Sequence, residues 1–331
     1  MKIPGIKAVR KTSGWLQDRI FGGALIIGYH RIAYPNGDES DIAVTPAHFS
    51  EQMEIVRKYA QPIRLTDLVE HLIQGTMPHR SVAITFDDGY ADNLIHARPL
   101  LDQYQIPASI FISTDFLGRE FWWDELERLI LFSPSLPRAL QLNLRGGLFT
   151  WRSNELDAKR RDSEDRVDRR KLINSLYHRL KLLEIQEQRD VIHRIQHWSG
   201  NWMPTAIAHR ALSAVELKQL ADERLIDIGS HTCTHPILTK LPAGQQLDEI
   251  HRSKALLEEL IEKPVSGFAY PNGIFTKDIQ AMVMAAGYTF ACSSRQELTR
   301  RRWQRYSLPR FWPKDWDGDR FERSFRQWMG K

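Results

Sequence analysis

Short apolar runs recur along the chain, and stretches with helical periodicity separate most of them. The apolar runs lie at 24–30, 81–86, 108–113, 225–230, 265–271, 288–294 and 306–311. Near-continuous apolar runs of this length are typical of strands buried on both faces of a parallel sheet. Helical patterns lie at 45–60, 66–74, 243–262 and 278–286. The alternation of strand and helix predicts a parallel α/β fold.

The stretch from about 119 to 210 interrupts this alternation. It begins with the helical pattern WWDELERLILF, and a long helical region runs from about 155 to 198. Residues 157–171 carry a charge at 12 of 15 positions, which is typical of a solvated helix face. We therefore interpret residues 24–331 as one domain that carries a mostly helical insertion at about 119–210.

Residues 1–23 form a separate basic segment. An amphipathic helix is expected at 6–21, packed on its own domain or resting on a membrane surface. The segment lacks the continuous apolar region and the small-residue cleavage site of a signal peptide. The expected location is therefore cytoplasmic, with peripheral contact at the inner membrane face as the alternative that the basic segment leaves open.

The overall charge changes this picture little. The net charge is +5 in 331 residues, and acidic and basic side chains are interspersed, so nucleic-acid binding is not expected. An anionic membrane surface or an anionic glycan fits the same small excess. Two cysteines in a chain of this length do not form a disulfide framework.

Two polar motifs follow predicted strands. TFDDGY (85–90) places Asp87 and Asp88 at the end of an apolar run, and SHTCTHP (230–236) places His231 and His235 after another. In a helical turn, the spacing of four residues would bring both imidazoles to one side. Carboxyl ends of parallel strands are where barrel active sites lie. One Asp and two His leave an open position on Zn²⁺, which is typical of a catalytic site.

These motifs resemble those of the polysaccharide deacetylase (NodB-homology) family. Thr-Phe-Asp-Asp-Gly stands at 85–89, and His-Ser/Thr-x-x-His stands at 231–235. The resemblance implies a distorted (β/α) barrel, often of seven strands, and hydrolysis of N-acetyl or O-acetyl groups on carbohydrates. It also implies that Asp87 is the catalytic base, and that Asp88, His231 and His235 are the metal ligands.

Other positions depart from the family pattern. The segment GFAYPNG (267–273) lacks the expected arginine, and Arg310 is our candidate to replace it. The resemblance assigns Tyr270, Pro271 and Asn272 to the substrate and oxyanion side, with the backbone N–H of Tyr270 helping to hold the oxyanion. No histidine follows near the C-terminus. His30, in IIGYHRI, resembles the acid-supplying histidine of the biofilm-polysaccharide branch.

The predicted function is metal-dependent removal of acetyl groups from an N-acetylhexosamine-containing polysaccharide or glycolipid. Zn²⁺ is the expected cofactor, although Co²⁺, Ni²⁺ or Fe²⁺ could serve. An acetylated glycan, free or lipid-linked, is the expected partner. A glycoside hydrolase, a non-catalytic carbohydrate-binding relative and a deacetylase of a non-sugar amide remain alternatives.

Tryptophan is frequent in this sequence, with 10 in 331 residues. Sugar rings often stack on the faces of aromatic side chains. A buried tryptophan is nevertheless the commoner case. We expect one or two members of a set of five to line the substrate groove: Trp122, Trp123, Trp303, Trp312 and Trp316.

Overall fold

The computed structural model describes residues 23–34, 41–153, 162–204, 209–300 and 304–330. The N-terminal helix expected at 6–21 lies outside these residues and stays a prediction. Within the described ranges, we find no helix whose length and apolar character would let it cross a membrane.

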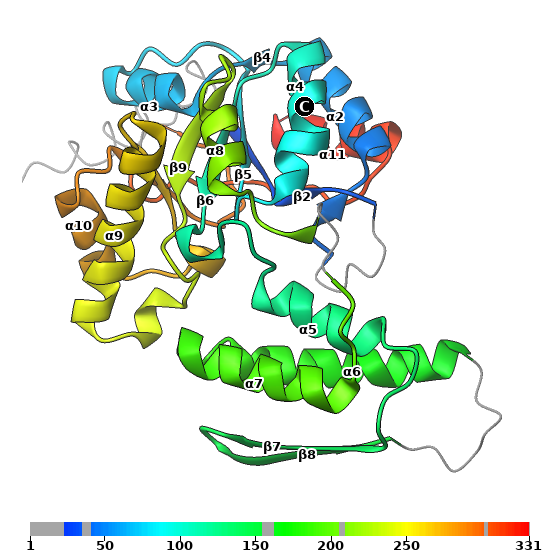
Figure 1. The fold of residues 1–331 in the computed structure, drawn as a ribbon. Helices are drawn as coiled ribbons and strands as arrows, with labels where there is room; N and C mark the ends of the chain where they lie inside the picture. The colour runs from blue at the N-terminus through cyan, green and yellow to red at the C-terminus, as the bar shows by residue number, and fades with distance from the viewer. Residues whose placement is uncertain (1–22, 35–40, 154–161, 205–208, 301–303, 331) are drawn as a thin grey trace, which may run out of the picture.

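A seven-stranded parallel sheet forms the centre of the molecule (Figure 1). Its order is β1-β5-β6-β9-β10-β11, and β4 also pairs with β5. The strands are β1 Leu25–Tyr29, β4 Gln61–Pro62, β5 Ser81–Phe86, β6 Ala108–Ile112, β9 Ile226–Ser230, β10 Gly267–Ala269 and β11 Phe290–Cys292. Every residue of β1, β5 and β6 is buried, as expected for strands covered on both faces. The predicted parallel α/β fold is confirmed.

A short segment at 308–311 links the two ends of this sheet. Leu308 forms a parallel bridge to β11, and Phe311 forms one to β1. The sequence predicted a full strand at 306–311, whereas the structure contains only these isolated bridges. Pro309 lies between them and has no N–H to donate to a strand ladder. The sheet is therefore curled into the distorted barrel that was predicted.

Helices surround the sheet, with α2, α4 and α11 together on one side and α9 and α10 on another (Figure 1). The helices predicted at 45–60, 66–74, 243–262 and 278–286 are confirmed as α2, α3, α9 and α10. The barrel helices are α2 Pro46–Tyr59, α3 Leu65–Gln74, α4 Arg98–Tyr104, α8 Ala214–Ala221, α9 Ala243–Ile261, α10 Lys277–Ala285 and α11 Gly318–Trp328. Shorter elements are β2 Arg31–Ile32, β3 Ala43–Val44, η1 Asn93–Ala97, η2 Thr114–Phe116, η4 Leu238–Lys240 and η5 Pro271–Gly273.

The insertion lies below the barrel in Figure 1 and has a hydrophobic core of its own. It contains α5 Trp122–Leu131, β7 Ala139–Leu144, β8 Gly147–Arg152, α6 Asp162–Leu180 and α7 Ile185–Ser199. The region predicted as one long helical stretch is two helices. The antiparallel β7–β8 hairpin was not predicted, although residues 140–144 alternate between apolar and polar side chains and two glycines follow at 146 and 147.

The two ends of the insertion pair with each other. The backbone N–H of Gly118 donates to Leu212 O, and that of Ala211 donates to Arg119 O, at 2.9 and 2.8 Å. The chain therefore leaves the barrel and returns to it at one place.

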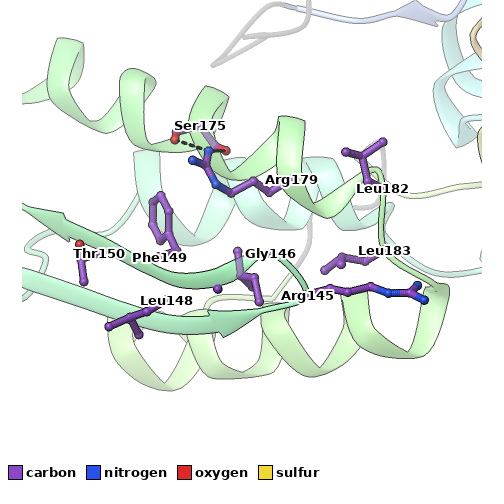
Figure 2. A pocket seen from close by; sticks show the side chains of 11 residues that line it. Arg145, Gly146, Leu148, Phe149, Thr150, Ser175, Arg179, Leu182 and Leu183 are labelled. Atoms are coloured by element: carbon purple, nitrogen blue, oxygen red, sulfur yellow. Dashed lines mark hydrogen bonds between the residues drawn. The ribbon is translucent and has the colours of Figure 1, made fainter.

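A cavity of about 600 Å³ lies between the hairpin and α6 (Figure 2). Its walls are mainly apolar side chains and backbone, with Arg145 and Arg179 as its charged groups. Arg179 donates to the Ser175 hydroxyl at 2.9 Å. Among the described residues that line it, none is a carboxylate, a histidine or a cysteine.

Candidate active site

Two neighbouring carboxylates follow β5 directly. The backbone N–H of Asp87 donates to Tyr29 O at 2.9 Å and so continues the pairing with β1. Asp88 and Gly89 then adopt positive φ angles of 72° and 83°, which turns the chain away from the sheet. A Cβ atom on Gly89 would lie 2.6 Å from the Ile112 side chain, which would have to shift, and the positive φ makes a larger residue strained at this position. Because of this turn, the two carboxylates reach different partners.

The two histidines follow β9 and are joined by a tight loop. The expectation of a helical turn is wrong here, because Thr232 and His235 have φ angles of 67° and 55°, outside the right-handed helical region. Glu249 of α9 holds the loop by accepting the backbone N–H and the hydroxyl of Thr234, at 2.9 and 2.7 Å. The loop brings the rings of His231 and His235 together, with centroids 4.9 Å apart.

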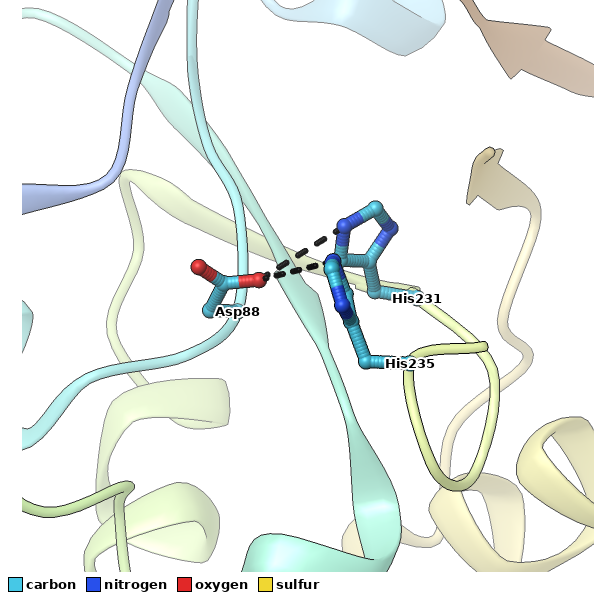
Figure 3. Close-up of side chains that lie close together, drawn as sticks. All are labelled: Asp88, His231 and His235. Atoms are coloured by element: carbon cyan, nitrogen blue, oxygen red, sulfur yellow. Dashed lines mark ion pairs between the residues drawn. The ribbon is translucent and has the colours of Figure 1, made fainter. Parts of the chain in front are cut away.

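Asp88, His231 and His235 converge on one point (Figure 3). Asp88 Oδ1 lies 3.6 Å from His231 Nε2 and 3.5 Å from His235 Nε2. His231 Nδ1 lies 2.7 Å from Ala269 O. Since a carbonyl oxygen only accepts, we assign the proton of His231 to Nδ1, which leaves the lone pair of Nε2 facing Asp88.

The three side chains fit a divalent cation. Asp88 Oδ1 is buried without a hydrogen-bond partner among the described residues, which is costly for a carboxylate. Its distances to both imidazoles match the roughly 3.3–3.5 Å between tetrahedral ligands that each lie about 2.0–2.2 Å from Zn²⁺. Burial and the charge of Asp87 raise the pKa of Asp88 well above its ordinary value. Burial lowers the pKa of His231 and His235. A bound cation would therefore stabilise the ionised Asp88 carboxylate and use the lone pairs of the two uncharged imidazoles.

The other carboxylate, Asp87, pairs with Arg310. The guanidinium donates from Nη1 to Oδ1 at 2.7 Å and from Nη2 to Oδ2 at 2.8 Å, and both side chains are buried. Burial alone would raise the pKa of Asp87, but Arg310 and His231 hold it below its ordinary value. Arg310 thus occupies the position that the replacement hypothesis requires, and its role in turnover stays a prediction.

A pocket of about 240 Å³ surrounds these groups. Of the predicted site residues, all but the buried Pro271 line it. The pocket is lined by His30, Ile42, Asp87, Asp88, Trp123, Tyr177, His231, His235, Tyr270, Asn272, Gly273, Ser294, Arg310 and Trp312. The pocket is smaller than the cavity beside the hairpin, but it holds the clustered ionisable side chains that mark a candidate active site.

His30 enters this pocket from the end of β1. Its ring stacks on Trp312, with centroids 4.9 Å apart and planes at 27°. Burial lowers the pKa of His30 to about 4, although the charge of Asp87 acts in the opposite direction. The imidazole is therefore uncharged at neutral pH in the resting protein.

The segment at 270–273 borders the same pocket. The backbone N–H of Tyr270, predicted to help hold an oxyanion, donates to Cys292 O at 3.1 Å. The Tyr270 N–H is therefore already used within the sheet and would have to leave Cys292 O, or be shared with it, to donate to an oxyanion. Asn272, with a φ of 56°, is the other predicted residue of this segment that lines the pocket.

Sequence reasoning missed part of the pocket wall. Tyr177 from α6 and Ile42 line the pocket, and their sequence surroundings carried no signal for this role. Of the five tryptophans, Trp123 and Trp312 line the pocket, and their contact with a substrate stays a prediction. Trp303 lies outside the described residues.

Comparison with a sequence model of the family described as "Polysaccharide deacetylase" gives a match over residues 74–131 and 177–291. A "Poly-beta-1,6-N-acetyl-D-glucosamine N-deacetylase" of Staphylococcus aureus is 29% identical over 110 residues, and that of Staphylococcus epidermidis is 30% identical over 108 residues. These matches cover 29% of this chain, and 38% and 37% of the respective relatives.

Solved structures resemble this chain over nearly its whole length. IcaB from Ammonifex degensii matches with a TM-score of 0.60 at 16% identity, covering 94% of this chain and 98% of that one. The Streptococcus pyogenes deacetylase PplD, in complex with acetate, matches with a TM-score of 0.59 at 15% identity, covering 93% and 98%. At these identities the likeness concerns the fold.

Proposed function

This chain belongs to the polysaccharide deacetylase family, and we propose that it hydrolyses N-acetyl groups on an N-acetylhexosamine-containing glycan with the help of a divalent cation. One observation carries this proposal. The carboxylate Asp87, held by Arg310, shares a pocket with Asp88, His231 and His235, three side chains placed so that they could hold a metal ion.

Asp88, His231 and His235 would hold the cation. We propose Zn²⁺, because two imidazoles and one carboxylate suit it, while Co²⁺, Ni²⁺ or Fe²⁺ could serve. When bound, such a cation polarises a carbonyl group and lowers the pKa of a water molecule. The chain itself supplies the remaining groups.

We assign the role of general base to Asp87. The Arg310 pair fixes both carboxylate oxygens and keeps them ionised. Each oxygen retains a further lone pair, so Asp87 can still accept a proton from the attacking water. Its Oδ2 lies 3.9 Å from His231 Nε2, which places this oxygen beside the proposed cation site. Positioned base catalysis of this kind contributes typically about 10²–10⁴-fold.

We assign the role of general acid to His30. An amine is a poor leaving group and needs a proton as it departs. The stacked Trp312 fixes the plane of the His30 ring. Because the resting imidazole is uncharged at neutral pH, His30 must gain its second proton during turnover, when negative charge develops nearby.

The substrate class rests on the relatives. The curated relatives are named for poly-β-1,6-N-acetyl-D-glucosamine, and this chain spans 38% or less of their length. We therefore propose the broader class of N-acetylhexosamine-containing glycans. A glycosidase needs two carboxyl groups about 5–9.5 Å apart across a glycosidic bond. Here the two adjacent carboxylates have separate partners, an arginine and an imidazole pair, which favours deacetylation.

The test is release of acetate from β-1,6- and β-1,4-linked N-acetylglucosamine oligomers. We expect zinc-loaded protein to release acetate, chelator to abolish the release, and added Zn²⁺ to restore it. Asp88→Ala should lose both metal and activity. Asp87→Asn should retain the metal, measured by elemental analysis, and lose turnover.

The products separate the rival functions. Shortened oligomers without acetate would indicate a glycosidase, and binding without either product would indicate a carbohydrate-binding protein. Acetate release that persists in metal-free protein would contradict the proposed role of the cation.

A further inference from the structure

We propose that Trp123, supported by Tyr177, forms the wall against which the substrate sugar ring packs, so that the insertion completes the glycan site. The identity of the sugar rests on the proposed function. Both residues belong to the insertion, Trp123 to α5 and Tyr177 to α6, and both line the pocket that holds the barrel residues Asp87 and His235.

Two tryptophans border this pocket, each against a histidine. Trp312, beyond the bridges that close the barrel, stacks on His30. Trp123 lies against the proposed metal ligand His235, with ring centroids 5.1 Å apart. The sugar that carries the reacting acetyl group must lie beside these same histidines. Trp123 therefore stands where the sugar ring would pass.

A chain of hydrogen bonds fixes the orientation of Trp123. Its Nε1–H donates to the Tyr90 hydroxyl at 2.8 Å, and that hydroxyl donates to Asp124 Oδ2 at 2.7 Å. Arg31 lies 3.8 Å from the other oxygen of Asp124. Phe121 stacks on Trp123, with ring centroids 4.7 Å apart and planes at 13°. A ring held in this way loses little conformational freedom when a ligand binds.

The chemistry of this wall indicates what it contacts. The only polar atom of the Trp123 side chain is already bonded within the protein. Trp123 lines the pocket and is 9% exposed, so the part of its ring that faces the pocket offers a small apolar surface and no hydrogen bond. A pyranose ring presents an apolar face of C–H groups to such a surface. Tyr177 extends the wall, because Trp122 stacks on Tyr177 at 5.4 Å and meets Trp123 edge-on at 5.3 Å.

The test compares Trp123→Leu and Trp123→Phe on two substrates. An N-acetylglucosamine oligomer carries the sugar ring, whereas 4-nitrophenyl acetate carries only an acetyl group. We expect Trp123→Leu to raise KM for the oligomer by about tenfold or more. The ratio of kcat/KM for the oligomer to that for the ester should fall by a similar factor. Trp123→Phe should recover much of this loss.

The matched control is Trp198→Leu. Trp198 belongs to the same insertion, donates from Nε1 to Ala139 O, and is not among the pocket-lining residues. Its replacement should leave both substrates unaffected. Zinc content of every variant is measured, because Trp123 contacts His235. An equal loss on both substrates, or a loss of zinc in Trp123→Leu, would show that the ring acts through His235 and would overturn the proposal.

The proposed deacetylase function and the proposed role of Trp123 can be tested separately. If the wild-type protein releases no acetate from the oligomer, the substrate assignment is wrong. The wall is then tested by saturation-transfer NMR with N-acetylglucosamine on the zinc-loaded protein. Binding that is lost in Trp123→Leu and kept in Trp198→Leu supports the wall, whereas equal binding, or no binding, in all three proteins contradicts it.

Discussion

The barrel and the insertion contribute to one pocket by different structural means. The barrel residues Asp87 and His231 follow β5 and β9, two parallel strands that both pair with β6, and are placed by the register of the sheet. The insertion residues Trp123 and Tyr177 come from helices with a separate hydrophobic core. The proposed base and metal ligands thus stand on the sheet of the barrel, while the surface proposed to contact the sugar stands on an appended unit. Such an arrangement allows the contact surface to change without altering the reacting groups.

The barrel and the insertion meet directly beside the turn at Asp88 and Gly89. Tyr90, two residues after Asp88, belongs to the core of the insertion and forms an isolated bridge with Ala211. The backbone N–H of Leu212 donates to Gly89 O at 2.9 Å. The returning end of the insertion is therefore bonded to the turn that exposes the two carboxylates. The predictions below ask how far changes in one unit affect the other.

The largest effect is expected in the barrel, from Arg310→Lys. A lysine cannot form the paired hydrogen bonds that Arg310 makes to Asp87. Because Asp87 is the proposed general base and positioned base catalysis contributes typically about 10²–10⁴-fold, we expect kcat to fall by roughly 100-fold or more. Arg305→Lys, on the exposed surface nearby, is the control. Near-normal turnover in Arg310→Lys would show that Asp87 does not depend on this pair.

Arg310→Lys should also change the pH dependence of kcat/KM in a defined direction. In the wild type, Arg310 opposes the effect of burial and holds the pKa of Asp87 below its ordinary value. A base with a lowered pKa stays ionised above that value and is lost only as the pH falls through it. Weaker pairing in Arg310→Lys lets burial raise this pKa. The acid limb of the kcat/KM profile should therefore move to higher pH.

His30→Ala is expected to slow hydrolysis of the glycan amide much more than hydrolysis of an activated ester. If His30 protonates the departing amine, its loss should slow deacetylation of the glycan by about 10²-fold or more. Hydrolysis of 4-nitrophenyl acetate should suffer far less, because 4-nitrophenolate leaves without a proton. Steady-state rates on the two substrates give the comparison. Equal losses on both would indicate that His30 supports the fold of the pocket and does not act as the acid.

The barrel could be predicted from sequence far better than the insertion. Buried strands such as SVAITF are unmistakable apolar runs, and Asp87 and Asp88 follow one at the edge where parallel strands expose active-site residues. The histidine pair was found by spacing, but its loop was taken for a helical turn. Nothing local in the sequence reveals that Thr232 and His235 adopt positive φ, because Glu249 of a later helix holds that loop.

The pocket wall from the insertion depends on tertiary packing. Tyr177 follows a highly charged stretch at 157–171 and lies among ordinary apolar core residues of α6, and its place is set by stacking on Trp122. Periodicity within one helix does not report which distant helix it meets. The β7–β8 hairpin left a clearer signal, because residues 140–144 alternate between apolar and polar side chains and Gly146 and Gly147 follow them, a pattern typical of a turn between strands.

The smallest effect on activity is expected at the far side of the insertion, from Leu142→Ala. Leu142 of β7 is 2% exposed and belongs to the same hydrophobic core as Trp123. Its truncation should lower the free energy of unfolding by about 2–5 kcal/mol. KM for the oligomer should stay within about twofold of wild type at 25 °C, as expected for independent sites. Thermal unfolding and steady-state kinetics on one preparation test both statements. A KM that rises as in Trp123→Leu would show that the hairpin and the pocket wall are coupled through the core of the insertion.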